Sequence, residues 1–241
     1  MLSLYSLMIL LILIIIIIII CGKFIYDQHK FNDSTKIIQL QDSNKTTINN
    51  YTKEKSPIVI HNLLNKHIDL ENFSLEKINQ NNPGYIIKDN NKNIVFSSLL
   101  DDNNMSINNN EQIIKDINLE NHFQSLINTF TDHFSYNITN KMNILKGPYS
   151  INLSQNKNNI KLISQLVGES ILYIFNPKYK EEIINKENFE IKKWGAKIIL
   201  KTGILLYIPS DWFYIIESED KSIFVTSTID TYFTFIYNSL R

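Results

Sequence analysis

Short apolar runs recur at regular intervals through the second half of the chain, and this spacing constrains the fold more than any other feature. Each run is rich in Ile, Leu, Tyr and Phe and ends at polar or turn-forming residues. Runs of about 4–8 residues with this composition are typical of strands in β-sandwiches and barrels. We therefore expect strands at Tyr149–Leu153, Ile160–Val167, Ser170–Phe175, Ala196–Leu200, Ile204–Ile208, Phe213–Ile216, Ser222–Ile229 and Tyr232–Tyr237, with a helical turn at Lys178–Ile184. The expected fold is mainly β, a jelly-roll barrel with flanking helices.

The region before these strands predicts the flanking helices and one hairpin. A short helix is expected at Ser74–Gln80, followed by paired strands at Tyr85–Ile87 and Ile94–Phe96. Apolar residues recur at helical spacing in Glu111–Ile117 and Leu119–Phe134. These segments predict two helices that pack on a sheet.

The N-terminus is a long uncharged segment. Leu2–Ile20 is mostly Leu and Ile, and about 20 apolar residues suffice to span the roughly 30 Å hydrocarbon core of a bilayer. A cleaved signal peptide would have a basic start and a shorter apolar core, so an uncleaved single-pass anchor over residues 1–22 is favoured. Lys23, Lys30 and Lys36 all follow the segment, which favours the cytosolic face for the rest of the chain.

A polar stretch separates this anchor from the folded part. Residues 23–55 show no sustained apolar periodicity, which predicts a polar tether that does not fold by itself. Ser56–His61 then reads as a strand with Pro57 near its start, where a missing N–H donor is tolerated. The folded domain is expected to cover residues 56–241.

Charge and cysteine content exclude several classes of protein. The 241 residues contain 24 Lys and Arg against 24 Asp and Glu, so no net field attracts nucleic acid, and we expect no nucleic-acid partner. Cys21 is the single cysteine, which excludes an internal disulfide and a zinc site built from cysteines.

Two segments carry a family resemblance. Gly203–Ser218 reads Gly-Ile-Leu-Leu-Tyr-Ile-Pro-Ser-Asp-Trp-Phe-Tyr-Ile-Ile-Glu-Ser, which predicts a hairpin-like unit around the turn at Pro209. This segment resembles the closing strands of the JmjC/cupin-like hydroxylases, the cupin 8 or asparaginyl-hydroxylase type of 2-oxoglutarate dioxygenase. Gln165–Pro177 resembles the Gln-x-x-Gly strand pair of the same family. The matching positions are Gln165, Gly168, Gly203, Pro209 and Trp212.

The resemblance implies a double-stranded β-helix, but this chain departs from the family at the metal site. The family's two His and one carboxylate bind iron(II), and their positions correspond here to Gln155, Lys157 and Tyr214. The lysine that holds the 2-oxoglutarate carboxylate corresponds to Ser170. No His, Asp or Glu occurs between His133 and Glu169, so a shifted alignment supplies no substitute ligand.

We therefore expect no metal and no cofactor. An inward Lys157 would repel a cation, whereas an outward Lys157 would leave the site empty. Tyr214 is expected to fill part of the former site, with its hydroxyl reaching Gln155 or Lys157.

Three functions remain open. The first is a membrane-anchored, catalytically inactive cupin-like scaffold or binding module for a protein or peptide. The second is a hydroxylase or demethylase with a non-standard metal site that uses His61, His67, His122 or His133. The third is a structural membrane or envelope glycoprotein with a β-rich ectodomain. Its glycan acceptors would be Asn32, Asn44, Asn50, Asn72, Asn104, Asn137 and Asn152.

Overall fold

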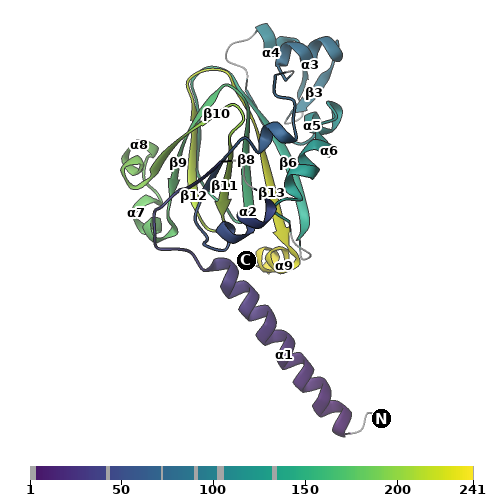
Figure 1. Ribbon diagram of the computed structural model, residues 1–241, viewed down its shortest axis with the longest axis vertical. Helices are drawn as coiled ribbons and strands as arrows, with labels where there is room; N and C mark the ends of the chain where they lie inside the picture. The colour runs from purple at the N-terminus through teal and green to yellow at the C-terminus, as the bar shows by residue number, and fades with distance from the viewer. Residues whose placement is uncertain are drawn as a thin grey trace.

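Two sheets with facing inner surfaces form the body of the protein (Figure 1). The computed structural model describes residues 4–41, 44–71, 73–89, 92–101, 106–131 and 135–240. One sheet has the strand order β1-β2-β11-β8-β13-β6-β5, the other has the order β10-β9-β12-β7, and β3 and β4 form a separate hairpin. The strands are β1 Ile38–Gln41, β2 Ile58–His61, β3 Ile86–Asp89, β4 Lys92–Val95, β5 Ile107–Asn110, β6 Ser135–Leu145, β7 Tyr149–Gln155, β8 Ile160–Val167, β9 Glu169–Phe175, β10 Ala196–Lys201, β11 Leu205–Pro209, β12 Phe213–Ser218 and β13 Ser222–Thr231.

Helices flank the sheets. They are α1 Leu4–His29, α2 Lys45–Thr52, α3 Leu75–Asn81, α4 Ser98–Asp101, α5 Gln112–Asp116, α6 Glu120–Ile127, α7 Lys180–Ile183, α8 Asn188–Ile191 and α9 Tyr232–Leu240, with 3-10 turns at Leu64–Lys66, Pro177–Tyr179 and Lys192–Trp194. The prediction of a mainly β fold with flanking helices is confirmed. The expected helix at Leu119–Phe134 is shorter, because α6 ends at Ile127; residues 132–134 lie outside the described part of the chain.

From β6 onward the chain repeatedly changes sheet. β6, β8, β11 and β13 lie in the larger sheet, whereas β7, β9, β10 and β12 form the smaller one, and all these neighbours pair antiparallel. Side chains from both inner faces pack into one apolar cluster that includes Ile163, Leu172, Leu206, Trp212 and Phe224. The result is a sandwich in which every connection from β6 to β13 crosses between the layers except that between β9 and β10.

The segment Gly203–Ser218 is a corner, and the prediction of a hairpin-like unit is wrong. β11 pairs with β2 and β8, whereas β12 pairs with β7 and β9. Asn156 fixes the corner: its side-chain amide donates to the carbonyl oxygens of Ile208 and Pro209 at 3.0 and 2.9 Å. Asp211 has a φ of +66° there. Both strands are buried on both faces, whereas an isolated hairpin would expose one face to solvent.

Part of the predicted tether is folded. β1 pairs in parallel with β2, which extends the larger sheet by one strand. Ile48 of α2 is fully buried in the core, and Asn44 caps this helix by accepting a hydrogen bond from the Thr47 N–H at 2.9 Å. Residues 38–41 and 44–52 therefore belong to the β-domain, because burial of a few apolar side chains offsets the entropy lost when this polar segment becomes ordered.

The C-terminal segment is helical, although Tyr232–Tyr237 was expected to be a strand. Thr231 forms the last pair of β13, opposite Ser135, which is the first residue of β6. Among the described residues, β6 thus offers no pairing partner beyond Thr231. The Thr231 hydroxyl accepts a hydrogen bond from the Thr234 N–H at 3.2 Å and caps the first turn of α9.

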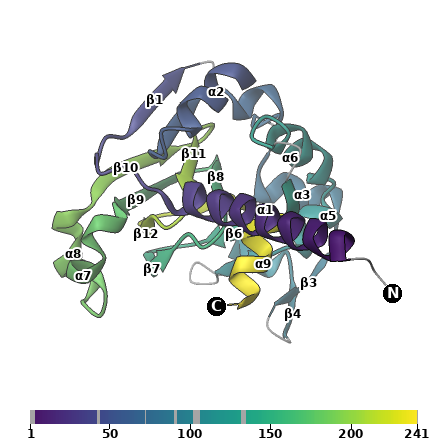
Figure 2. The same ribbon diagram turned by 90° about the horizontal axis from the view of Figure 1, so that it is seen from below.

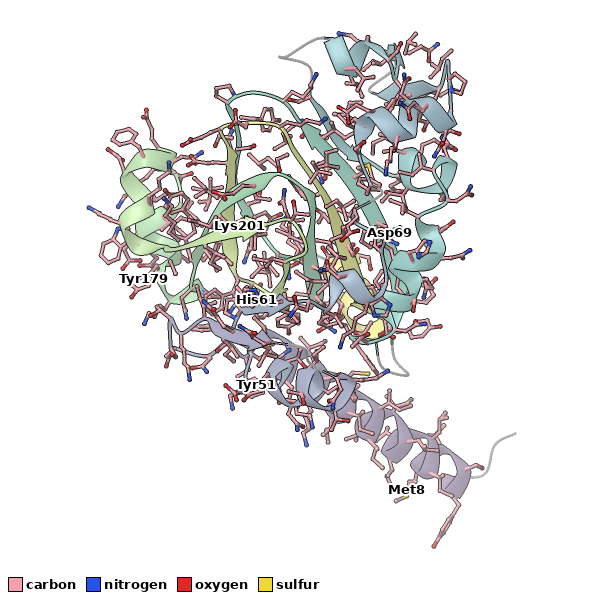
Figure 3. All side chains as sticks on the ribbon, turned by 45° about the horizontal axis from the view of Figure 1, so that its top comes forward. Met8, Tyr51, His61, Asp69, Tyr179 and Lys201 are labelled. Carbon is pink, nitrogen blue, oxygen red and sulfur yellow. The ribbon has the colours of Figure 1, made fainter. Side chains whose placement is uncertain are left out.

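Helix α1 leaves the β-domain as a single rod (Figure 1). It continues beyond the predicted end at residue 22 and ends at His29. Residues Tyr5–Asp27 are long and apolar enough to cross a membrane, by length and composition. Figure 3 shows side chains such as that of Met8 projecting from α1 away from the β-domain, and the apolar side chains from Leu7 to Ile20 are all exposed.

Candidate functional site

The position that resembles the third metal-ligand site lies between the two sheets. Tyr214 on β12 is 7% exposed and pairs directly with Ser154 on β7. Lys161 reaches it from β8 in the opposite sheet, and its Nζ donates a hydrogen bond of 2.6 Å to the Tyr214 hydroxyl. The same Nζ lies 4.8 Å from the centre of the Tyr214 ring. A lysine and a tyrosine therefore share this part of the interior.

Apolar side chains surround this pair. Tyr214 packs in one buried cluster with Ile163, Ile174, Ile208 and Trp212. Trp212 is 1% exposed, and its indole N–H donates to the Lys55 carbonyl oxygen at 3.2 Å. Both aromatic rings are thus buried between the two sheets.

Gln155 and Lys157 do not converge on Tyr214. Gln155 pairs with Phe213, so its side chain lies on the opposite face of β12 from Tyr214. Its amide group donates to the backbone and carboxylate oxygens of Asp211 at 3.4 and 3.3 Å. Lys157 is exposed beyond the end of β7. The expected contact of the Tyr214 hydroxyl with Gln155 or Lys157 is therefore replaced by the contact with Lys161.

Ser154 and Asn156 lie nearer to the interior than Gln155 and Lys157. Both precede those positions by one residue. Ser154 faces Tyr214, and Asn156 is fully buried at the corner between β11 and β12. Side chains alternate between the two faces of β7, but which of them face Tyr214 depends on the pairing with β12. That pairing includes a bulge between Tyr214 and Ile216, which the sequence does not reveal.

Ser170 lies in a neutral polar cluster at the other end of the sandwich. Its hydroxyl is 2.7 Å from the Ser222 hydroxyl, which also accepts a hydrogen bond of 2.8 Å from the Gln165 side-chain amide. Ser170, Gln165 and Ser222 are all fully buried. No cation at Ser170 is available to hold a carboxylate, and its hydroxyl is committed to a structural contact.

The two motif glycines have backbone reasons to be glycine. Gly168 has a φ of +73°, and a Cβ there would overlap the carbonyl oxygen of Lys221. Gly203 has a φ of +89°, and its N–H donates to the Gln165 carbonyl oxygen at 2.9 Å. Gln165 and Gly203, which belong to the two resembling segments, are thus bonded to each other.

The donor set between the sheets does not fit an iron(II) ion. Ser154, Asn156 and Tyr214 offer neither an imidazole nor a carboxylate, which are the ligands that non-haem iron sites use. The Lys161 ammonium adds a positive charge, and two unit charges about 4 Å apart repel by about 4 kcal/mol at an effective dielectric constant of 20. Among the described residues, no group of three His, Cys, Asp or Glu side chains is placed to hold a metal ion.

The one buried carboxylate on the inner side of β13 is already held by its neighbours. Asp230 accepts a hydrogen bond of 2.7 Å from the Asn158 side-chain amide and one of 3.1 Å from the Asn159 N–H. Burial raises the pKa of this carboxyl above its usual value, against these two hydrogen bonds. Asp230 therefore fastens the loop before β8.

Two of the histidines considered as alternative ligands, His67 and His122, lie close to each other at α6. The His67 Nδ1 forms a hydrogen bond of 3.1 Å with the Ser125 hydroxyl on α6. The His122 Nδ1 lies 2.8 Å from the His67 carbonyl oxygen. Burial lowers the pKa of His67, and Lys66 and His122 lower it further. His61 ends β2 (Figure 3), and His133 lies outside the described residues.

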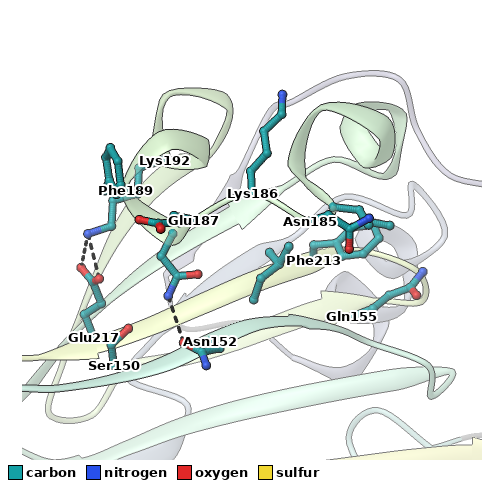
Figure 4. A pocket seen from close by; sticks show the side chains of 13 residues that line it. Ser150, Asn152, Gln155, Asn185, Lys186, Glu187, Phe189, Lys192, Phe213 and Glu217 are labelled. Carbon is teal, nitrogen blue, oxygen red and sulfur yellow. Dashed lines mark hydrogen bonds and ion pairs between the residues drawn. The ribbon is translucent and has the colours of Figure 1, made fainter.

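An open groove of about 810 Å³ lies on the outer face of the smaller sheet (Figure 4). Phe213 and Leu153 form its apolar floor, and the segment after α7 forms its wall. Lys192 and Glu217 form an ion pair of 2.7 Å across one end, which neutralises the nearest carboxylate. Lys186 and Glu187 also line the groove, so it offers a mixed apolar and charged binding surface.

Several predicted glycan acceptors are engaged within the fold. The Asn32 side chain donates to Ser56 and Glu54, and Asn44 caps α2. Asn50, Asn137 and Asn152 are exposed, while Asn72 and Asn104 lie outside the described residues.

Comparisons with known proteins add one distant structural similarity. No protein-family model and no curated protein sequence matches this chain. Among solved structures, the chain is similar to a cupin superfamily protein from Desulfitobacterium hafniense, at 13% sequence identity and a TM-score of 0.29. The similarity covers 39% of this chain and 67% of that protein.

Proposed function

We propose that this protein is a membrane-anchored, non-catalytic β-domain with a double-stranded β-helix of the cupin type, acting as a scaffold or binding module. The strand order supports the fold: β6, β13, β8 and β11 face β7, β12, β9 and β10, and the chain crosses between the layers at nearly every turn. The two segments that resemble JmjC/cupin-like hydroxylases lie at the centre of both layers. Helix α1 supplies the anchor.

One observation carries the non-catalytic assignment. The Lys161 ammonium and the Tyr214 hydroxyl lie 2.6 Å apart at the place where the family's iron would be bound. This part-buried hydrogen bond satisfies both groups, and it places a positive charge where the family holds a cation. Ser154 on β7 and Asn156 just after this strand also lack an imidazole or a carboxylate, so neither side of the site carries a ligand of the family's type.

Metal binding by the full chain tests this proposal. The detergent-purified protein is incubated with iron(II) and 2-oxoglutarate, desalted, and analysed for metal content and for 2-oxoglutarate turnover. We expect neither stoichiometric metal nor turnover above background. Stoichiometric iron, or 2-oxoglutarate consumption that depends on the protein, would contradict the proposal.

A gain-of-binding variant makes the test two-sided. Ser154→His with Tyr214→His places two imidazoles on directly paired residues, and Lys161→Ala removes the repelling ammonium. We expect this triple variant to bind nickel(II) or cobalt(II), and Tyr214→His alone to bind neither. Binding by Tyr214→His alone would show that Lys161 does not exclude a cation.

A further inference from the structure

We propose that the β-domain lies against the bilayer through an aromatic surface, the α9 face, which is made of Tyr232, Phe235 and Ile236 on α9 and Tyr136 on β6. This inference rests on the proposed role of α1 as a membrane anchor. It adds that the domain does not hang free from α1, because a second part of the chain enters the interfacial layer.

The exposed side of α9 is the apolar side. Tyr232, Phe235 and Ile236 are 52%, 48% and 55% exposed, and their spacing places them on one face of the helix. Thr234, on the opposite face, is fully buried against the domain. A helix on an aqueous surface shows the reverse pattern, whereas a helix lying in a membrane interface places aromatic and aliphatic residues outward.

Tyr136 extends this surface onto the neighbouring strand. Its ring lies 4.2 Å from the Tyr232 ring and 5.6 Å from the Phe235 ring, measured between centroids, and it is 51% exposed. Four large apolar side chains thus form one continuous patch. Tyrosine is well suited to the headgroup level, where its ring is in an apolar layer and its hydroxyl in a wet one.

Helix α9 lies beside the end of α1 that joins the domain (Figure 2). The rings of Phe24 on α1 and Phe233 on α9 are stacked, with centroids 4.6 Å apart and planes 12° apart. Phe24 lies near the end of the apolar span Tyr5–Asp27, and the exposed Tyr26 follows it. This level of α1 corresponds to the aromatic belt of a spanning helix, so the α9 face is at the depth of the membrane surface.

A lysine borders the same surface. The Asn238 side-chain amide on α9 donates a hydrogen bond of 2.9 Å to the Lys157 carbonyl oxygen, and the Lys157 side chain is exposed. A lysine beside an interfacial apolar patch can direct its ammonium to lipid phosphates while its methylene groups stay in the apolar layer. Lipid is the favoured occupant, since a partner at this depth would have to share the space with the bilayer that α1 enters.

Depth-dependent quenching tests the contact in the full chain. In a Cys21→Ser background, a fluorophore is attached to Ile236→Cys on the α9 face, and in a second protein to Ile86→Cys. Ile86 is a matched control, because it is 52% exposed and lies on β3, at the end of the domain far from α1 (Figure 1). Both proteins are reconstituted into phosphatidylcholine vesicles that contain a lipid with a nitroxide near its headgroup.

We expect the label at position 236 to be quenched several-fold more strongly than the label at position 86. Equal quenching in protein that floats with the vesicles would overturn the α9 contact and leave the anchor intact. Failure to float with vesicles would overturn both. Energy transfer between labels on different chains, without quenching by lipid, would overturn the lipid assignment and assign the α9 face to a second copy.

Discussion

The side chains of Lys161 and Tyr214 meet between the two sheets, with the lysine Nζ 2.6 Å from the tyrosine hydroxyl oxygen. Each residue comes from a different sheet, β8 in the larger and β12 in the smaller. The pair therefore links the two layers through a polar contact inside an otherwise apolar cluster. Removal of either side chain should therefore lower the free energy of unfolding.

Tyr214→Ala should lower the free energy of unfolding by about 3–5 kcal/mol, because truncation of a buried aromatic ring leaves a cavity. Chemical denaturation of the full chain in detergent measures the change. Ile199→Ala is the control, since Ile199 is 45% exposed and should change stability by no more than about 0.5 kcal/mol. Equal stability of Tyr214→Ala and the parent would show that the ring does not fill the interior.

Tyr214→Phe isolates the hydroxyl. The ring stays in place, but the Lys161 ammonium loses its partner, which costs about 1–3 kcal/mol when the remaining group is buried. Lys161 is only half-buried, so the lower end of this range is expected. Adding Lys161→Met should recover part of the loss in a double-mutant cycle. Additive losses would mean that the two side chains are not coupled.

Gly168→Ala should destabilise the fold more than Gly84→Ala. Both glycines have positive φ, +73° and +77°, where a Cβ costs roughly 1–2 kcal/mol. At Gly84 the added Cβ meets nothing within 4 Å, whereas at Gly168 it overlaps a backbone oxygen of Lys221. The difference between the two variants in thermal unfolding measures the steric part. Similar losses would show that the Lys221 backbone moves away freely.

The ion pair between Glu76 and Lys221 predicts a pH dependence. A hydrogen bond from Lys221 at 2.9 Å lowers the pKa of Glu76 from 4.5 to about 2. Because the folded-state pKa is below the unfolded one, the stabilisation is present above pH 4.5 and is lost as the pH falls toward 2. The effect is small, since exposed pairs contribute about 0–1 kcal/mol.

Denaturation curves recorded from about pH 5 down to about pH 2 check this prediction, because this range includes both the unfolded-state and the folded-state pKa of Glu76. Glu76→Gln should flatten the pH dependence, whereas Glu181→Gln, another exposed carboxyl, serves as the matched control. A slope unchanged by Glu76→Gln would assign the acid sensitivity to other groups.

Two arginines in α1 should abolish stable membrane association. Ile14→Arg with Ile16→Arg places two charges near the middle of the apolar span, at roughly 2.5–3.5 kcal/mol each on insertion scales. Flotation of expressed protein with membranes gives the result. Continued flotation of this variant would indicate that the α9 face or another part of the domain holds the bilayer independently.

The sequence alone predicted most strands between residues 149 and 229, because the alternation and the type of side chains are local properties that favour extended structure. β8, β9 and β13 begin and end within two residues of the predicted positions. The lack of His, Asp and Glu between His133 and Glu169 is also a property of the sequence that no folding can change. The absence of these ligand types from β7 and β8 follows from it.

Only the tertiary structure decided which strands are neighbours and which side chains meet. β11 and β12 are adjacent in sequence and lie in different sheets, since pairing partners are chosen by burial of distant segments. The bulge beside Tyr214 sets the register with β7 and thereby exchanges Gln155 for Ser154 on the inner face. The contact of Lys161 with Tyr214 and the helical form of Tyr232–Leu240 were likewise decided by the tertiary structure. In both cases, contacts between residues far apart in the sequence override local preference.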